Sequence, residues 1–256
     1  ASITDATEDQ LDQLRDSSDG DAVVQHLAER YHRGMFYAAL GEALIVVNPF
    51  TPLPNVTHPG TGFANWAADA IRPHPFATAD RTFRAMRSER RARTVVINGV
   101  SGSGKSFVCR QMLDQWASLP GNFTVGARLV HANRLLDQLC NAKTVRNDDG
   151  SRISKVIHAH FDRATGHLVG GQFVTMQLDQ ARLLAPPTSD RNYHIFYQLL
   201  AAAEAGTLPG GTEFVASLEL RQASDYRLLA GSGCVVVPGL DDTVEQAELS
   251  SALLAV

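Results

Sequence analysis

The sequence predicts an α/β fold in which a mixed sheet is flanked by helices around a phosphate-binding loop. Residues 99–106 read Gly-Val-Ser-Gly-Ser-Gly-Lys-Ser, which fits the pattern G-x-x-x-x-G-K-[ST]. The apolar run Thr94–Asn98 predicts a strand directly before the loop, and residues 105–116 predict a helix directly after it. Further strand and helix patterns alternate on both sides, as in α/β proteins.

Length and composition limit the class of protein. A chain of 256 residues has room for one large domain or two small ones. A net charge of −4 argues against a general nucleic-acid binder, and three cysteines are too few for a disulfide framework or zinc cluster. No apolar run has the length of a membrane span. The polar, acidic first residues do not resemble a targeting peptide, and without an initiator Met we expect the chain to be cut from a longer one.

The elements before the loop are read from periodicity and stop signals. We expect a helix over 19–33 that ends at Gly34, strands over 35–40 and 42–48 that are broken at Gly41, a proline-rich connection over 48–55 and an arginine-rich helix over 80–91.

The elements after the loop follow in the same way. We expect helices over 105–116 and 127–139, no regular structure over 141–152, and strands over 153–161 and 167–178 that are joined by a hairpin turn at 162–166. A helix over 190–205 follows, and then short helices and glycine-rich turns.

The loop itself indicates a nucleotide phosphate. In such loops the backbone N–H groups and the positive end of the following helix face the anion. Lys105 is one of only three lysines, whereas the other twenty basic residues are arginines. A compact ammonium suits β- and γ-phosphates better than a planar guanidinium does. We therefore expect Lys105 to neutralise the phosphates and the Ser106 hydroxyl to bind Mg²⁺.

A second polar segment, Asn141–Lys155, has no amphipathic period, so core packing does not explain it. Its Asn, Ser and Arg side chains are suited to a triphosphate and its metal. The alternative is a solvated loop between a helix and a strand.

These two segments resemble those of the myosin motor domain. The family's phosphate loop reads G-E-S-G-A-G-K-T and its switch I reads N-A-K-T-x-R-N-x-N-S-S-R-F-G-K, where this chain has Asn-Ala-Lys-Thr-Val-Arg-Asn-Asp-Asp-Gly-Ser-Arg-Ile-Ser-Lys over 141–155. Residues 41–50, 73–81 and 190–199 also resemble family motifs, in the family's order. The resemblance implies a P-loop NTPase-type sheet and an incomplete motor domain over 1–256, with parts at 1–93, 94–152 and 153–256.

The resemblance also implies roles for individual residues. Asn48 and Pro49 are expected to contact the adenine. The residues expected to contact the phosphates are Gly99, Ser101, Gly102, Ser103, Gly104, Lys105, Ser106 and Asn147. Ser106 and Ser151 complete the Mg²⁺ shell, and Arg152 pairs with a switch II carboxylate. Lys105, Asn147, Ser151 and Arg152 carry catalysis.

Several family residues are replaced. Gly150 stands where switch I has a serine that relays a proton, Val100 replaces a glutamate, and the adenine-contacting tyrosine expected near Val56 is missing. The switch II motif D-x-x-G-F-E does not occur in these residues, so we expect this chain alone to bind nucleotide but to hydrolyse it poorly.

Three other patterns favour structural roles. His158 and His160 share one face of a strand without an evident third metal ligand. The arginines over 81–93 predict a solvated helix face, with an acidic partner as the alternative. Tyr193, Phe196, Tyr197 and Leu200 form a stripe that predicts core packing.

The resemblance implies the ATP- and Mg²⁺-binding part of a cytoplasmic, cytoskeleton-associated actin motor, with light chains, if any, bound outside this chain. One alternative is a degenerate motor that serves as a nucleotide-binding scaffold without turnover. Another is a P-loop small-molecule kinase that uses the arginine-rich helix as a phosphate clamp.

Overall fold

The computed structural model describes residues 10–11, 20–51, 73–119, 123–177 and 179–256. It divides into two compact units. The first comprises Ala1–Gly126 and Phe161–Val169, and the second comprises Ala127–His160 and Gly170–Val256. The expected division at residues 93 and 152 stays a prediction.

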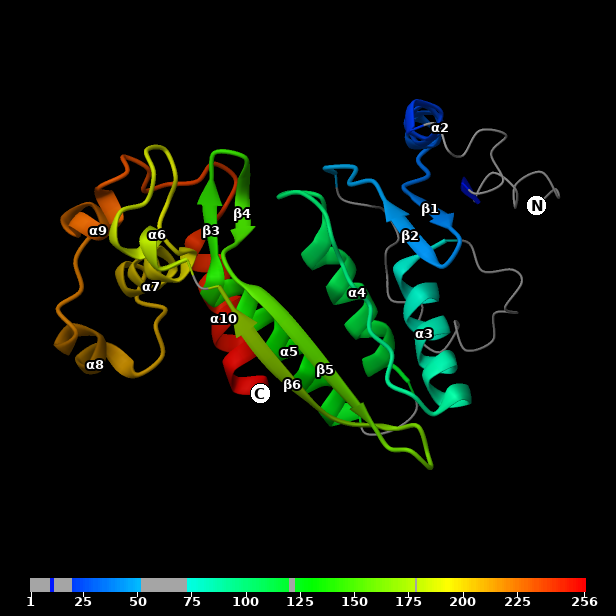
Figure 1. The fold of residues 1–256 in the computed structure, drawn as a ribbon. Helices are drawn as coiled ribbons and strands as arrows, with labels where there is room; N and C mark the ends of the chain where they lie inside the picture. Colours follow the sequence, from blue (N-terminus) through cyan, green and yellow to red (C-terminus); the bar gives the residue numbers. More distant parts are fainter. Residues whose placement is uncertain (1–9, 12–19, 52–72, 120–122, 178) are drawn as a thin grey trace. The chain divides into compact units, whose positions relative to one another are not determined.

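The described elements are helices and short strands (Figure 1). The helices are α2 (Gly20–His32), α3 (Pro75–Glu89), α4 (Lys105–Ala117), α5 (Phe123–Cys140), α6 (Gln180–Leu184), α7 (His194–Glu204), α8 (Gly211–Ser217), the 3₁₀ helix η4 (Ala223–Asp225), α9 (Arg227–Ala230) and α10 (Asp242–Ala255). The strands are β1 (Tyr37–Leu40), β2 (Ala43–Val46), β3 (Asn141–Thr144), β4 (Asn147–Ser151), β5 (Ser154–Phe161) and β6 (Leu168–Met176). They pair as β1–β2, β3–β4 and β5–β6.

The core of the first unit lies between α3 and α4. Ala79 of α3 packs against Val108 and Met112 of α4, and Val46, Val95, Ile97 and Trp116 surround them. The indole N–H of Trp116 donates to the Ala79 carbonyl at 3.0 Å, so the two helices are joined by a hydrogen bond as well as by apolar contact. Figure 1 shows α3 and α4 running side by side beneath the β1–β2 pair.

Most elements expected from the sequence are confirmed. Helix α2 ends two residues before Gly34, which has φ of 74°, and the Gly34 N–H donates to the Tyr31 carbonyl. Strands β1 and β2 pair antiparallel around Gly41. The turn between β5 and β6 is held by the Asp162 carboxylate, which accepts from the Thr165 N–H at 2.7 Å. Local signals therefore determined these boundaries.

The strand expected over 94–98 is wrong. These residues form no regular structure, and Val95 and Ile97 pack against the core while Val96 is 82% exposed. Among the described residues no backbone pairs with the segment. An apolar alternating run predicts the conformation of a strand, but a strand also requires a hydrogen-bonded neighbour.

The absence of regular structure expected over 141–152 is also wrong, because β3 and β4 form an antiparallel hairpin there. Asn141 pairs with Ser151 and Ala142 with Gly150, and the register is interrupted between Ala142 and Thr144. This pairing depends on backbone hydrogen bonds and on contacts from residues distant in the sequence, so it leaves no hydrophobic period.

Three helices begin several residues from the expected positions, and α5 is one of them because it begins at Phe123 rather than at residue 127. Helix α3 begins at Pro75 rather than at residue 80, because the His74 side chain accepts from the Phe76 N–H and caps it. Helix α7 begins at His194 rather than at residue 190, and the preceding residues bind the hairpin instead.

In the second unit α7 packs against α10 and contacts β3. Tyr193 and Tyr197 are buried, which confirms the predicted core stripe at these two positions. On β6, Gly171 permits close approach: a Cβ there would lie 2.4 Å from the Leu129 side chain of α5. No described helix combines the length and apolar character needed to cross a membrane.

The cap of α3 generates a prediction about pH. Burial lowers the pKa of His74 from 6.5 to about 4, so the folded state requires the neutral ring. The stabilisation is therefore present above pH 6.5 and is lost as the pH falls toward 4. We expect a loss of about 2 kcal/mol of unfolding free energy over this range, after allowing for partial exposure.

Urea unfolding at pH 7, 6, 5 and 4 measures this loss. His74→Asn is the control, because Asn also caps helices but does not titrate. The variant should show a smaller loss over this range. Equal pH dependence in both proteins would contradict the assignment.

Candidate functional site

The phosphate loop has a conformation that only glycine tolerates at several positions. Gly102 and Gly104 have φ of 79° and 92°, and Gly99 has φ of 156°. A Cβ on Gly99 would lie 2.5 Å from the Ser103 hydroxyl oxygen. The Ser103 N–H donates to the Val100 carbonyl at 3.2 Å and closes the turn. The loop is thus a compact backbone cradle in the first unit.

The N-terminus of α4 is open to an anion. Gly104 occupies the N-cap position, so no side chain caps the helix, and the first turn holds no acidic residue. The first N–H groups of α4 are therefore left without helical or side-chain acceptors. Ser101 is exposed, while Ser103 and Ser106 are half-buried. This is the geometry in which a helix end binds phosphate.

The Lys105 ammonium lies back over the loop. Its Nζ donates to the carbonyls of Gly99 at 2.9 Å and Val100 at 2.7 Å. An ammonium has three donors, so one remains for a bound anion. The positive charge thus lies beside the backbone cradle in the first unit, and the role of Lys105 toward phosphates stays a prediction.

Asn48 holds the loop from outside. Its Nδ2 donates to the Gly102 carbonyl at 2.7 Å, and its Oδ1 accepts from the Phe50 N–H at 3.0 Å. The Pro49 carbonyl accepts from the Tyr31 hydroxyl at 3.1 Å, so this connection is fixed at both residues. The family resemblance implies only an adenine contact for Asn48 and does not predict its bond to Gly102. No local signal reveals a bond across 54 positions.

A groove of about 810 Å³ lies beside the loop in the first unit. Residues of β2, α3, the 93–100 segment and α4 line it, including Lys105, Ser103, Arg81, Arg93 and Glu42. The arginines of α3 are exposed, as expected, and several have partners within the unit. Arg84 pairs with Asp80 at 2.6 Å, and Arg93 pairs with Glu89.

The candidate switch residues lie on the β3–β4 hairpin of the second unit. The Thr144 hydroxyl accepts from the Asn147 N–H at 3.0 Å, and the Asn147 Oδ1 accepts from the Asp149 N–H at 3.1 Å. The Ser151 hydroxyl donates to the Ile153 carbonyl at 3.3 Å, which leaves its lone pairs for a cation. The hairpin turn is therefore ordered by its own polar side chains.

Residues 189–191 hold the hairpin from outside. The Lys143 ammonium donates to the Ser189 carbonyl at 3.0 Å, and the Asp190 carboxylate accepts from the Val145 N–H at 2.8 Å. The Arg191 N–H donates to the Lys143 carbonyl at 3.1 Å. Sequence reasoning noted this segment as a motif but did not connect it with the hairpin.

Arg152 has a partner within the chain. Its guanidinium donates to the Asp179 carboxylate at 3.2 and 3.3 Å, and Arg182 lies 3.4 Å from the same oxygen. Burial opposes ionisation of Asp179. The Arg182 N–H and the Arg152 guanidinium outweigh it, so the pKa of Asp179 is below its usual value. A switch II carboxylate would have to share or replace this contact.

Comparison with known proteins decides the family. The family described as myosin head (motor domain) matches residues 8–256. This chain belongs to the myosin head family. It is 32% identical to Myosin-13 of Arabidopsis thaliana over 90% of its length and 33% identical to unconventional myosin heavy chain 6 of Caenorhabditis elegans over 91%. It is 32% identical to unconventional myosin-Ia of Gallus gallus over 95%.

The chain spans only a fraction of these myosins: 15% of Myosin-13, 11% of the heavy chain 6 protein and 23% of myosin-Ia. The two candidate segments of this myosin head chain lie in different units, with the phosphate loop in the first and the hairpin in the second.

The positions that depart from the family pattern differ in their surroundings. Gly150 is buried on β4, and a Cβ there would lie 3.4 Å from the Ala142 carbonyl, which is ordinary contact. Val100 is 79% exposed on the phosphate loop. Val56 lies outside the described residues. A Cβ at position 150 therefore meets no clash within the hairpin.

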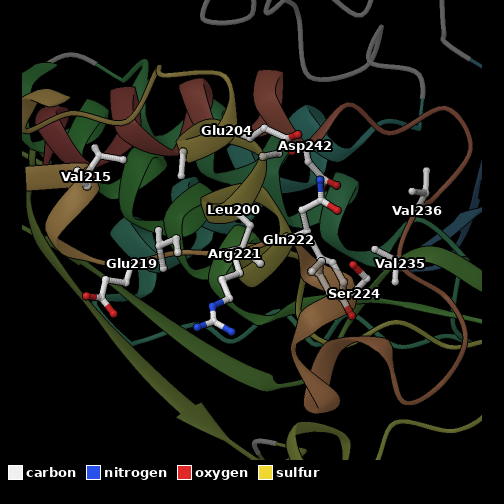
Figure 2. A pocket seen from close by; sticks show the side chains of 16 residues that line it. Leu200, Glu204, Val215, Glu219, Arg221, Gln222, Ser224, Val235, Val236 and Asp242 are labelled. Carbon is white, nitrogen blue, oxygen red and sulfur yellow. The ribbon is translucent and has the colours of Figure 1, made fainter.

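Figure 2 shows a cavity of about 640 Å³ in the second unit. Apolar side chains of Leu200, Val215, Val235 and Val236 line it together with charged residues that include Glu204, Glu219, Arg221 and Asp242.

His158 and His160 are exposed on β5, and their rings stack at 6.4 Å. Within the described part of the chain, no three His, Cys, Asp or Glu residues are grouped as a metal site requires.

The Asn48 bond generates a prediction. Asn48→Asp keeps the acceptor for the Phe50 N–H but turns a carboxylate toward the Gly102 carbonyl. We expect it to lower the free energy of unfolding by about 1–3 kcal/mol in urea titrations, because the donor is lost and two acceptors face each other.

Asn98→Asp is the matched control. The Asn98 Oδ1 accepts from the Gly99 N–H at 2.8 Å, and a carboxylate keeps that bond. It adds the same charge beside the same loop, and we expect it to change stability by less than about 0.5 kcal/mol. Equal losses in the two variants would show that charge alone, and not the bond to Gly102, is responsible.

Proposed function

We propose that this chain is the ATP- and Mg²⁺-binding part of an actin-based motor that couples ATP hydrolysis to movement along actin filaments. The observation that carries the proposal is the phosphate loop, in which glycines with positive φ, the uncapped α4 and the Lys105 ammonium form one cradle. Membership of the myosin head family supports the motor assignment.

The residues of the loop fit a nucleotide phosphate. The backbone of 99–104 can approach an anion closely, because side chains are excluded at Gly99, and the α4 N–H groups can donate to it. We assign Lys105 to the β- and γ-phosphates. Asn48 and Pro49 are assigned to the adenine, and Asn147 to the phosphates.

The hydroxyls of Ser106 and Ser151 fit the chemistry of Mg²⁺. This ion takes oxygen ligands, keeps several waters and needs few protein groups beside the nucleotide phosphates. When bound it neutralises phosphate charge. Ser106 lies in the first turn of α4, and Ser151 has free lone pairs. Arg152 orders the hairpin through a carboxylate, here that of Asp179.

The longer protein is proposed to bind actin and to be cytoplasmic and cytoskeleton-associated. Light chains, if any, would bind beyond these residues.

One observation favours a second candidate, a scaffold that binds ATP without turnover. Gly150 places no hydroxyl where the family's switch I has a serine.

Removing the Lys105 ammonium should abolish tight nucleotide binding. We expect Lys105→Ala to weaken the affinity of the chain for a fluorescent ATP analogue with Mg²⁺ by at least about tenfold, because a charge-assisted contact to phosphate is lost. Arg91→Ala removes one positive charge from an exposed position of the same unit and is the control. Equal affinity of Lys105→Ala and the unaltered chain would refute the nucleotide site.

Adding a hydroxyl at position 150 separates motor from scaffold. If turnover is limited by the missing relay, Gly150→Ser in the longer protein should raise ATP hydrolysis by about a hundredfold, the lower end of the usual contribution of a proton-transfer group. Affinity for ATP should not change. Gly170→Ser is the control, because nothing lies within 4 Å of a Cβ there. A motor that already shows actin-stimulated phosphate release with Gly150 would exclude the scaffold.

A further inference from the structure

The hairpin that carries the candidate switch residues is bound along its length by the segment 189–194. Besides the contacts of residues 189–191, Ala142 forms an isolated bridge with Tyr193, and the His194 Nε2 lies 3.0 Å from the Asp148 carbonyl. The Asp149 carboxylate lies 3.7 Å from the same nitrogen. Both strands of the hairpin and its turn are therefore contacted from one short segment.

These contacts come from residues that the protein has removed from water. Asp190, Arg191, Asn192 and His194 are each at most 5% exposed. Burying charged and polar groups is costly unless they are paired. The sequence thus places four strongly polar residues in a position where apolar residues would pack at lower cost.

Arg191 is the clearest case. Its Nη2 donates to both carboxylate oxygens of Asp242 at 2.7 Å, and its guanidinium carbon lies 3.8 Å from the centre of the Tyr197 ring. Its Nε and Nη1 have no partner among the described residues. A fully buried guanidinium with unused donors contributes little net stability. What Arg191 contributes is position: once its side chain is fixed, its backbone N–H is placed to donate to the Lys143 carbonyl.

Arg182 reinforces the same arrangement. Its Nη1 donates to the carbonyls of Lys143 at 3.3 Å and Arg191 at 3.1 Å, and its Nη2 donates to Asp190 at 2.8 Å. A single buried side chain therefore joins the hairpin backbone to the segment that holds it. The hairpin and the segment are therefore cross-linked by several contacts, of which those of Arg182 are three.

We propose that residues 189–194 form a clamp that holds the β3–β4 hairpin in place before nucleotide binds, with Arg191 and His194 as positioning residues. The inference rests on the proposed function for its consequence, which is that nucleotide meets an ordered hairpin. The entropy cost of ordering the hairpin is then met when the protein folds, so the free energy of nucleotide binding does not have to offset it.

Hydrogen–deuterium exchange of the nucleotide-free chain tests the clamp directly. His194→Ala removes the donor to the Asp148 carbonyl, and we expect exchange over 141–151 to rise at least tenfold. His194→Gln returns a nitrogen near the same position and should restore protection to within about threefold. His160→Ala is the control, because this histidine is exposed on β5. Exchange over α5 and α10 should not change in any variant.

Lys143→Met is a milder second variant in case His194→Ala does not fold. It removes the ammonium that donates to the Ser189 carbonyl and also lies 3.9 Å from the Asp148 carboxylate, and exchange over 141–151 should rise about threefold. Unchanged hairpin exchange in both variants would overturn the clamp. A uniform rise that includes α5 and α10 would also overturn it, because it would show ordinary core packing.

Nucleotide kinetics in the longer protein provide the second readout. A hairpin that must be ordered on binding should raise KM for ATP at least about fivefold in His194→Ala, with less than twofold change in kcat, and His194→Gln should restore KM. A fall in kcat at unchanged KM would contradict the clamp. Since the exchange experiment contains no nucleotide, it remains decisive even if Lys105→Ala refutes the nucleotide site.

Discussion

The buried guanidinium of Arg191 joins three elements of the second unit. It binds Asp242 at the start of α10 and stacks on Tyr197 of α7. The backbone N–H of the same residue donates to the Lys143 carbonyl of β3. Because a guanidinium is planar and always charged, it can be buried only where its partners are fixed. The positions of α7, α10 and the hairpin are therefore set together, and the remaining contacts of residues 189–194 follow from that arrangement.

In the first unit the phosphate loop is also held by side-chain donors. In the phosphate loop the N–H groups of Gly99 and Ser103 are paired, whereas the first N–H groups of α4 have no helical or side-chain acceptor and do not stabilise the loop. Its carbonyls are used instead: Lys105 binds those of Gly99 and Val100, and Asn48 binds that of Gly102. In both units the backbone of a candidate site is held by side chains that bind its carbonyls or N–H groups, and Asn48 and Asp190 come from distant parts of the chain. The binding groups thus remain available.

Much of the fold could be predicted from local signals. Gly34 ends α2, the Asp162 turn joins β5 to β6, and the loop lies directly before α4. The errors occur where a partner distant in the sequence decides the structure. Residues 94–98 have the pattern of a strand but no paired neighbour in the described chain, and 141–152 lack such a pattern yet form a hairpin. The start of α7 was misplaced because residues 190–193 bind that hairpin.

The sequence by itself determined the family of this chain and the chemical character of its candidate sites, because short motifs specify glycines, a lysine and hydroxyls at set spacings. Only the tertiary structure decided the partners of those residues. It showed that Asn48 binds the phosphate loop, that Arg152 pairs with Asp179 and that residues 189–194 hold the hairpin. Such contacts join positions tens of residues apart, and they depend on which polar groups the fold buries together.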